Sequence, residues 1–183
     1  MSEEILVRQG APTLARIKTG SLFPCPCEDR EALLSDIRKL NRRLSSKGLC
    51  LLPIRFLAGQ ALLYLYRPAV LRRDLRDARA SELLRQAGYA NESCARCVAQ
   101  LIRRFRESGE FPHEVGLFLS YPPEDVKGFI DHRANDFKCA GLWKVYGDEE
   151  KARSLFTKYR KCTEIYCALW QSGSRLEQLA VAV

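Results

Sequence analysis

The chain has 183 residues, of which 46% are hydrophobic and 28% are charged, and 30 Lys and Arg against 22 Asp and Glu give a formal net charge of +8. These proportions are typical of a globular domain and exclude a disordered or collagen-like chain. The acidic start, MSEEILVRQG, lacks the features of a secretory signal, and the longest apolar runs are too short to cross a bilayer. We therefore expect a cytoplasmic protein without membrane insertion that folds as a single globular domain over residues 1–183.

The positive charge is concentrated in the middle of the sequence, where residues 28–108 carry 17 basic and nine acidic side chains. Ten arginines fall in the segment 67–106, and arginine binds phosphate groups through paired hydrogen bonds. Nucleic-acid binding is therefore one alternative function. However, acidic side chains are interspersed with these arginines and no recognised nucleic-acid-binding motif accompanies them. This pattern favours a solvated helical face and argues against a nucleic-acid partner.

The first predicted elements are a helix and a hairpin. Leucines and an isoleucine spaced by three and four residues predict an amphipathic helix over residues 28–47, which Gly48 ends. The apolar runs LCLLPIRF and ALLYLY are separated by a short segment containing Gly59, a pattern that predicts a β-hairpin. Because Pro53 cannot donate a backbone hydrogen bond, its strand is expected at a sheet edge or at a bulge.

Helices are predicted after the hairpin. Residues 68–87 fit one broken helix or two short ones, since a proline suits the first turn and Gly88 follows the last apolar position. An apolar stripe over residues 94–105 predicts another helix, with Gly109 as its end.

The second half mixes strands with helices. The compact apolar stretch 114–119 predicts a strand, and a helix follows over residues 122–130. Residues 137–146 predict another strand, an apolar stripe predicts a long helix within residues 148–173, and the tail 176–183 fits a final strand. This order of elements predicts an α+β fold in which a mixed or antiparallel sheet of about four to five strands is covered by amphipathic helices.

Four of the eight cysteines occur as pairs, Cys25 with Cys27 and Cys94 with Cys97. Together they offer four thiolates, which is a ligand set of zinc or of an iron–sulfur cluster. Cys94 and Cys97 also lie on an apolar stripe, where a reduced cysteine behaves as a small buried hydrophobic residue. We favour this second interpretation and predict neither a bound metal nor another cofactor.

The segment 111–130, FPHEVGLFLSYPPEDVKGFI, gathers a histidine, three carboxylates, a tyrosine and a lysine around a predicted strand-to-helix junction. It resembles an uncharacterised bacterial family of unknown function whose members carry a similar F-P-H-E-x-G-x-F-L-G-Y-P-x-E-D-V-x-G-F-I segment. The Y-x-Y-R sequence at 64–67 and the W-K-V-Y sequence at 143–146 fit the same family. The resemblance implies a link to metal or redox physiology, but it implies no established activity.

Three residues depart from the family pattern, because Arg16, Ser120 and Ala134 stand where it implies glycine. Glycine permits close approach of the backbone to another group. These departures argue against a role that requires such an approach at the three positions.

The predicted strand-to-helix junction is the candidate site. Successive residues of a strand face opposite sides, so His113 and Glu114 are not expected to form a direct acid–base pair. The candidate catalytic residues are His113, Glu114 and Asp125. The candidate ligand-binding residues are Arg67, Tyr121, Glu124, Asp125, Lys144 and Tyr146.

These residues fit ligands of either charge. Lys144 or Arg67 would hold an anion, whereas Glu124, Asp125 and His113 would attract a cation or a metal ion. We expect substitution of His113 or Asp125 to affect ligand binding more than folding.

Common enzyme motifs are missing from the sequence, among them G-x-G-x-x-G, G-x-x-x-x-G-K-[ST], H-E-x-x-H and G-x-S-x-G. The sequence therefore favours a non-enzymatic domain that binds a small ligand or a protein partner at segment 111–130. An enzyme that uses His113 and nearby carboxylates for proton transfer is the alternative, so the sequence leaves enzymatic activity open.

Overall fold

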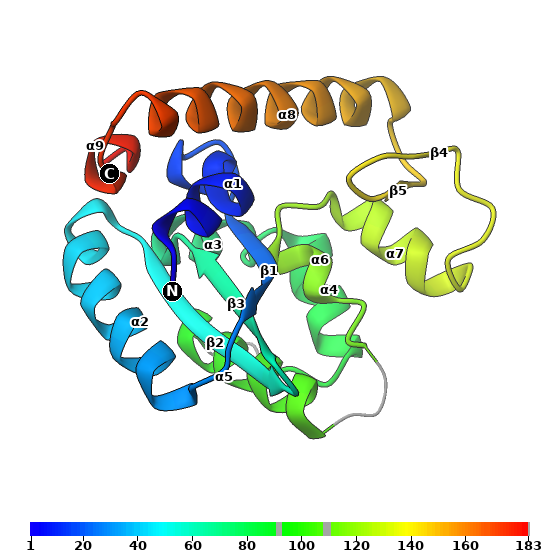
Figure 1. Ribbon diagram of the computed structural model, residues 1–183. Helices are drawn as coiled ribbons and strands as arrows, with labels where there is room; N and C mark the ends of the chain where they lie inside the picture. Colours follow the sequence, from blue (N-terminus) through cyan, green and yellow to red (C-terminus); the bar gives the residue numbers. More distant parts are fainter. Residues whose placement is uncertain (91–92, 108–110, 183) are drawn as a thin grey trace. The chain divides into compact units, whose positions relative to one another are not determined.

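The computed structural model describes residues 1–90, 93–107 and 111–182 (Figure 1). Within this described part, helices accompany two antiparallel sheets, one of three strands and one of two. The prediction of an α+β fold with antiparallel strands and covering helices is therefore confirmed. The strands divide between two sheets instead of forming one.

The chain forms two compact units. We call residues 1–69 with 161–183 the first unit and residues 70–160 the second unit. The chain returns to the first unit within its longest described helix, α8 (Glu149–Gln171). The single domain expected from the sequence stays a prediction.

The first unit is built on a three-stranded antiparallel sheet with the order β1-β3-β2. Its strands are β1 (Gly20–Pro26), β2 (Cys50–Leu57) and β3 (Gln60–Tyr66). β2 and β3 form the predicted hairpin around Gly59. The pairing register shifts between Pro53 and Arg55, which confirms the bulge expected at this proline.

Helices cover one face of this sheet. They are α1 (Glu3–Leu14), α2 (Arg30–Leu44) and α9 (Leu176–Leu179). Ala61, Leu63 and Leu65 alternate along β3 and lie fully buried in one hydrophobic core with these helices. Figure 1 shows α1 and α2 beside the strands. The predicted helix over residues 28–47 is confirmed by α2 and the short 3₁₀-helix η1 (Ser45–Lys47), and Gly48 follows in the left-handed conformation.

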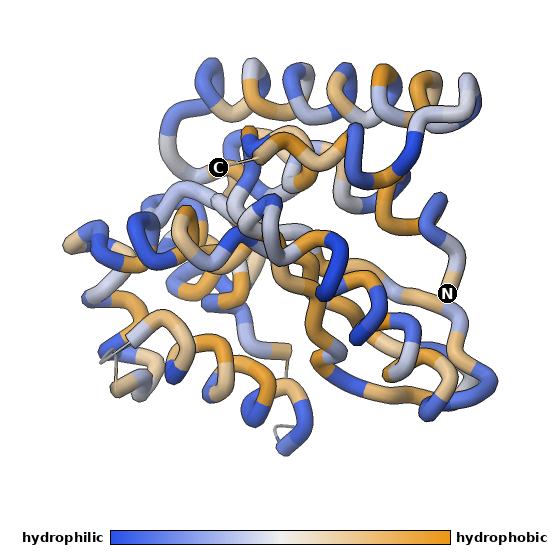
Figure 2. The backbone as a smooth tube through the Cα atoms, turned by 90° about the vertical axis from the view of Figure 1, so that its left-hand side faces the viewer, coloured by the Kyte–Doolittle hydropathy of each residue, from blue (hydrophilic) through white to orange (hydrophobic). Residues whose placement is uncertain are grey.

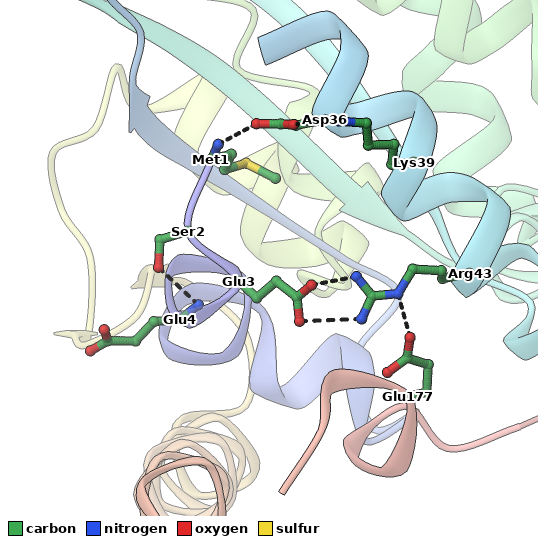
Figure 3. Close-up of polar contacts among 8 residues, drawn as sticks. All are labelled: Met1, Ser2, Glu3, Glu4, Asp36, Lys39, Arg43 and Glu177. Atoms are coloured by element: carbon green, nitrogen blue, oxygen red, sulfur yellow. Dashed lines mark hydrogen bonds and ion pairs between the residues drawn. The ribbon is translucent and has the colours of Figure 1, made fainter. Parts of the chain in front are cut away.

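An ion network fastens α2 to α1 and α9 within the first unit (Figure 3). The Arg43 guanidinium of α2 contacts the carboxylates of Glu3 in α1 and Glu177 in α9. The hydrogen bond from Arg43 lowers the pKa of Glu177 because it favours the ionised carboxylate. Asp36 of α2 forms a further ion pair with the Met1 ammonium group. These contacts join segments that are far apart in the sequence.

Two parts of the first unit differ from the sequence analysis. α1 and β1 were not predicted, because Gly10 and Pro12 weaken the helical pattern of α1 and prolines interrupt the alternation of β1. The strand expected over 176–183 is wrong, since α9 occupies the start of that tail. Leu176 and Leu179 lie three residues apart and are both buried, which matches the spacing of a helix.

The helices of the second unit largely follow the predictions. Residues 68–87 form two short helices, α3 (Pro68–Asp74) and α4 (Ala78–Gln86), and the stripe over 94–105 lies on α5 (Cys94–Glu107). Gly88 follows α4 with φ +81°, a conformation that favours glycine. Gly109, the expected end of α5, falls outside the described residues. The predicted helices over 122–130 and within 148–173 are confirmed by α7 (Pro123–Asp131) and α8.

The strand predicted over 114–119 is wrong, and the structure has a single helical turn there, α6 (Val115–Phe118). All four residues of α6 are buried. An apolar run that is buried on every side has no periodicity to separate a strand from a helix. The segment 111–130 is therefore a junction between two helices, and the argument that His113 and Glu114 face opposite sides of a strand no longer applies.

The strand predicted over 137–146 is wrong in extent. A small hairpin occupies this region, with strands β4 (Cys139–Ala140) and β5 (Lys144–Val145). Gly141 and Leu142 lie in the turn between them, and Figure 1 shows the hairpin beside α7.

Hydrophobic and hydrophilic residues alternate along the longer helices, such as α2, α5 and α8. Figure 2 shows this alternation turn by turn along α8. Among the described residues, no helix has both the length and the apolar character that are required to cross a membrane.

Candidate functional site

A cavity of about 480 Å³ lies within the second unit, where α6, α7 and the β4–β5 hairpin meet. We call it the aromatic cavity, because five of its lining residues carry aromatic rings. It is lined by Phe111, His113, Val115, Gly116, Tyr121, Asp125, Val126, Phe129, Ala140, Gly141, Trp143 and Lys144. Four of the predicted site residues, His113, Tyr121, Asp125 and Lys144, are thus brought together.

Asp125 anchors the hairpin to α7. Its side chain is buried, and one carboxylate oxygen, Oδ2, accepts a hydrogen bond of 2.7 Å from the indole nitrogen of Trp143. The other oxygen, Oδ1, accepts backbone hydrogen bonds from Tyr146 at 2.8 Å and Gly147 at 2.7 Å. Both oxygens of the carboxylate are therefore used within the protein. This arrangement indicates a structural role for Asp125, and the binding role expected from the sequence stays a prediction.

Close backbone packing at two glycines shapes the same region. A Cβ atom on Gly128 of α7 would lie 2.3 Å from the Tyr146 ring, and one on Gly141 would lie 2.3 Å from the Phe156 ring. Such distances are too short for real contacts. The absence of a side chain thus lets α7 approach the segment after β5, and lets the hairpin turn approach α8.

Stacked rings form one wall of the aromatic cavity. Tyr121 stacks on Trp143 with a centroid distance of 4.8 Å, and Trp143 meets Phe156 edge to face at 4.5 Å. The Tyr121 hydroxyl donates to the Leu142 carbonyl at 3.3 Å. Burial raises the pKa of Tyr121, so its hydroxyl stays neutral at physiological pH.

Two basic side chains line the same cavity. The ammonium group of Lys144 donates to the Ala134 carbonyl at 2.7 Å and lies 4.7 Å from the centre of the Phe137 ring. The imidazole of His113 is exposed and meets the Phe129 ring at 5.0 Å. It makes no side-chain hydrogen bond to any residue that the structure describes. The Lys144 ammonium group and the His113 imidazole can therefore each form further hydrogen bonds to a ligand.

Glu114 does not line the aromatic cavity. Its buried carboxylate accepts a hydrogen bond of 2.9 Å from the Tyr89 hydroxyl and forms an ion pair with Arg104 at 2.7 Å. Burial and the charge of Glu114 raise the pKa of Tyr89, which keeps that hydroxyl protonated. Glu114 and Arg104 line a second cavity of about 260 Å³, which shares Phe111 and His113 with the aromatic cavity.

Glu124 and Tyr146 also lie outside the lining of the aromatic cavity. Glu124 pairs with Arg79 at 3.3 Å and borders a separate hollow of about 280 Å³. The Tyr146 ring stacks on His132 at 5.6 Å, and its hydroxyl is buried without a hydrogen-bond partner among the described residues. The predicted ligand-binding set is therefore only partly assembled.

Arg67 belongs to the first unit, where it is fully buried. Its guanidinium donates to four backbone carbonyls at distances of 2.7 to 2.9 Å. These carbonyls belong to Thr13, Leu14, Lys47 and Val181. Arg67 thus ties together segments of the first unit. It does not line the aromatic cavity, and its expected contact with an anion stays a prediction.

The four paired cysteines divide between the units, with Cys25 and Cys27 in the first and Cys94 and Cys97 in the second. Burial raises the pKa of Cys25, Cys94 and Cys97, so the thiol form is favoured. Among the described residues, no three His, Cys, Asp or Glu side chains are gathered as a metal ion requires. None of the eight cysteines, all within the described ranges, forms a disulfide.

The three departures from the family pattern share one backbone feature. Arg16, Ser120 and Ala134 have φ values of +62°, +65° and +65°, in the left-handed region that favours glycine. This backbone conformation accounts for the glycine that the resemblance implies there.

Several lining residues were not predicted from the sequence. Val126, Phe129 and Ala140 carry no reactive group, so nothing in their type marked them. Trp143 lies in the W-K-V-Y segment of the family pattern, and its partner Asp125 lies in the E-D-V segment. The presence of both segments in one family pattern was the signal that could have suggested their contact.

Among the comparisons with known proteins, only the one with protein-family models gave a match. The curated proteins gave no match, and neither did the solved structures. The family model of DUF3793, described as a protein of unknown function, matches residues 6–180, which covers nearly the whole chain. The protein therefore belongs to the DUF3793 family.

Proposed function

We propose that this protein binds a small, largely apolar molecule with at least one ring in the aromatic cavity of the second unit. The observation that carries the proposal is the cavity itself. Its volume of about 480 Å³ lies within the range of small-molecule sites, and aromatic and aliphatic side chains line most of it. Flat rings stack favourably on aromatic side chains, which suits a ligand of this class.

The partners of the carboxylates favour binding over proton-transfer catalysis. A general base needs an oxygen or nitrogen free to reach a substrate proton. Asp125 uses both oxygens for three protein donors, and Glu114 is paired with Tyr89 and Arg104. His113 has no hydrogen bond to a carboxylate within the described ranges. These contacts support a binding protein and give little support to the enzymatic alternative.

The same contacts argue against a cationic ligand or a metal ion. Asp125 has no oxygen left without a protein donor, and Glu124 pairs with Arg79 beside a different hollow. The two carboxylates that would have attracted a cation are therefore already compensated by the protein.

A neutral fluorescent probe tests the proposal. N-phenyl-1-naphthylamine becomes fluorescent in apolar surroundings, and we expect saturable binding of one molecule per chain. Ala140 lines the cavity and is itself exposed, so Ala140→Phe fills space in the cavity without cutting into a closed core. We expect this variant to bind the probe at least tenfold more weakly.

Ala99 supplies the matched control. It is an exposed residue of α5 that does not line the aromatic cavity, so Ala99→Phe adds the same ring elsewhere in the second unit. We expect its affinity for the probe to stay within twofold of the unsubstituted protein. If Ala140→Phe and Ala99→Phe bind the probe equally well, the cavity is not the binding site and the proposal fails.

A further inference from the structure

The geometry points to an organic anion as the ligand, with an apolar ring system in the aromatic cavity and an anionic group, such as a carboxylate or sulfonate, held by Lys144 and His113. This inference rests on the proposed function, because it names the ligand class for the same cavity. It also decides between the two charges that the sequence left open.

The charges that line the cavity are unequally compensated. Asp125 receives three hydrogen bonds, one from an indole and two from the backbone. Lys144 receives no carboxylate partner within 4.0 Å among the residues that the structure describes. Its ammonium group has three N–H donors, and the Ala134 carbonyl takes one of them. Lys144 can therefore form further hydrogen bonds to a ligand, whereas both oxygens of Asp125 already accept hydrogen bonds from the protein.

His113 and Lys144 lie around one ring. The ammonium nitrogen of Lys144 is 6.0 Å from the centre of the Phe129 ring, and the His113 ring is 5.0 Å from the same centre. Both side chains also line the aromatic cavity, so we infer that an anionic group beside Phe129 contacts Lys144 and has His113 as its second donor. Lys144 supplies a full charge, and the imidazole supplies an N–H donor in either tautomer or when protonated.

The apolar lining strengthens such a contact. Hydrogen bonds between charged groups are about twice as strong as neutral ones, and surroundings of low dielectric constant weaken them less than water does. Phe111 and Phe129 stand beside His113, and Phe129 and Phe137 stand beside Lys144, so each donor has ring surface next to it. A ligand that combines rings with one anionic group would use the walls of the cavity and these donors together.

Two dyes that differ by one group test the inference. 1-Anilinonaphthalene-8-sulfonate has the ring skeleton of N-phenyl-1-naphthylamine and carries one additional sulfonate. We expect the sulfonate dye to bind at least tenfold more tightly than the neutral dye, and each dye to displace the other. Lys144→Met keeps an unbranched apolar side chain but removes the charge. It should reduce the preference for the sulfonate dye to less than threefold and leave the affinity for the neutral dye within twofold.

Lys138 provides the matched control. It is an exposed lysine just before β4, and its ammonium group donates to the Gly147 carbonyl outside the lining of the cavity. Lys138→Met should keep the full preference for the sulfonate dye. His113→Gln, which retains a hydrogen-bond donor without a ring, should lower the preference by a smaller factor than Lys144→Met does.

The outcomes separate the two proposals. If neither dye binds, or if Ala140→Phe leaves both affinities unchanged, the proposed function fails. If the neutral dye binds in a manner that Ala140→Phe blocks, the proposed function stands. The inference of an anionic ligand is then overturned when the sulfonate gives no advantage, or when Lys144→Met and Lys138→Met preserve that advantage equally.

Discussion

The carboxylate of Asp125 holds together the segments that form the aromatic cavity. Its removal would leave three donors without their acceptor, the buried Trp143 indole and two partly buried backbone N–H groups. Each unsatisfied buried donor costs about 1–3 kcal/mol before the structure relaxes. We therefore expect Asp125→Ala to lower the free energy of unfolding by about 2–4 kcal/mol, measured by urea denaturation.

The neighbouring carboxylate supplies the control for this prediction. Glu124 is half-buried, and among the residues that the structure describes its carboxylate pairs with the exposed Arg79 alone. Ion pairs of this kind contribute about 0–1 kcal/mol, so Glu124→Ala should stay within that range. Equal losses from the two substitutions would contradict a structural role for Asp125.

Ala134 gives a second prediction at the scale of single residues. Its φ of +65° costs an L-residue about 1–2 kcal/mol, and glycine avoids this cost. Glycine also loses more freedom on folding, which offsets about 0.5–1 kcal/mol. We expect Ala134→Gly to raise the free energy of unfolding by about 0.5–1 kcal/mol in urea denaturation.

The same substitution within a helix should have the opposite sign. Ala99 lies exposed in the interior of α5, where replacement of alanine by glycine costs about 1 kcal/mol. A loss of stability in both variants would show that the left-handed conformation at Ala134 carries no strain.

At the scale of whole elements, the ion network of Arg43 predicts a dependence on pH. The pKa of Glu177 is lowered from its ordinary value of 4.5, first by the hydrogen bond from Arg43. A carboxylate with a lowered pKa stabilises the folded state above its unfolded pKa, and this contribution is lost as pH falls through the folded pKa. Glu177 and Arg43 are partly exposed, so solvent limits the contribution to about 1 kcal/mol.

The test compares Arg43→Met with the unsubstituted protein by urea denaturation. We expect the variant to be less stable at pH 7 and the difference to shrink as the pH falls below 4.5. Arg42→Met, at an exposed position in the same turn of α2, should show neither effect. A difference that does not change between pH 7 and pH 3 would show that the loss comes from packing of the arginine stem.

The elements also show what a single sequence can and cannot predict. α2 and α5 carry apolar residues on one face and polar residues on the other, so their spacing alone located them. The four buried residues of α6 have no polar face, and this is why a strand was predicted in their place. The hairpin β4–β5 has strands of two residues each, too short for an alternation to be recognised.

The residues of the candidate site were also only partly predictable from the sequence. His113, Tyr121 and Lys144 were chosen by residue type and segment, and they line one cavity. The partners of Asp125 are 18 to 22 residues away in the sequence, so only the fold could reveal that its carboxylate is already used. The four carbonyl partners of Arg67 could not be predicted for the same reason, because they are up to 114 residues distant in the sequence.

For the whole molecule, the net charge of +8 raises the question of nucleic-acid binding. At least five arginines of the segment 67–106 form ion pairs with carboxylates of the described residues, which compensates part of the local positive charge. They are Arg73, Arg79, Arg85, Arg103 and Arg104. We expect binding to generic DNA or RNA no tighter than about 10⁻⁴–10⁻⁶ M at physiological salt, measured by fluorescence anisotropy. Nanomolar binding selective for one sequence would contradict this expectation.

The two units give the last prediction. The chain crosses between them at residues 69–70, inside α3, and again at 160–161, inside α8. A continuous helix forms and melts cooperatively, and the family match over residues 6–180 spans both units. We therefore expect the two units to unfold together, as the single domain predicted from the sequence requires.

Each unit contains one of the two tryptophans, Trp143 in the second and Trp170 in the first. In a Trp170→Phe variant, fluorescence follows Trp143 alone, while far-ultraviolet circular dichroism follows the helices of both units. Coincident midpoints in urea from these two signals are the mark of a two-state transition. If Trp143 reports unfolding at a clearly lower urea concentration than circular dichroism does, residues 70–160 unfold on their own. The prediction of a single domain is then wrong, because the second unit loses its structure while the helices of the first remain.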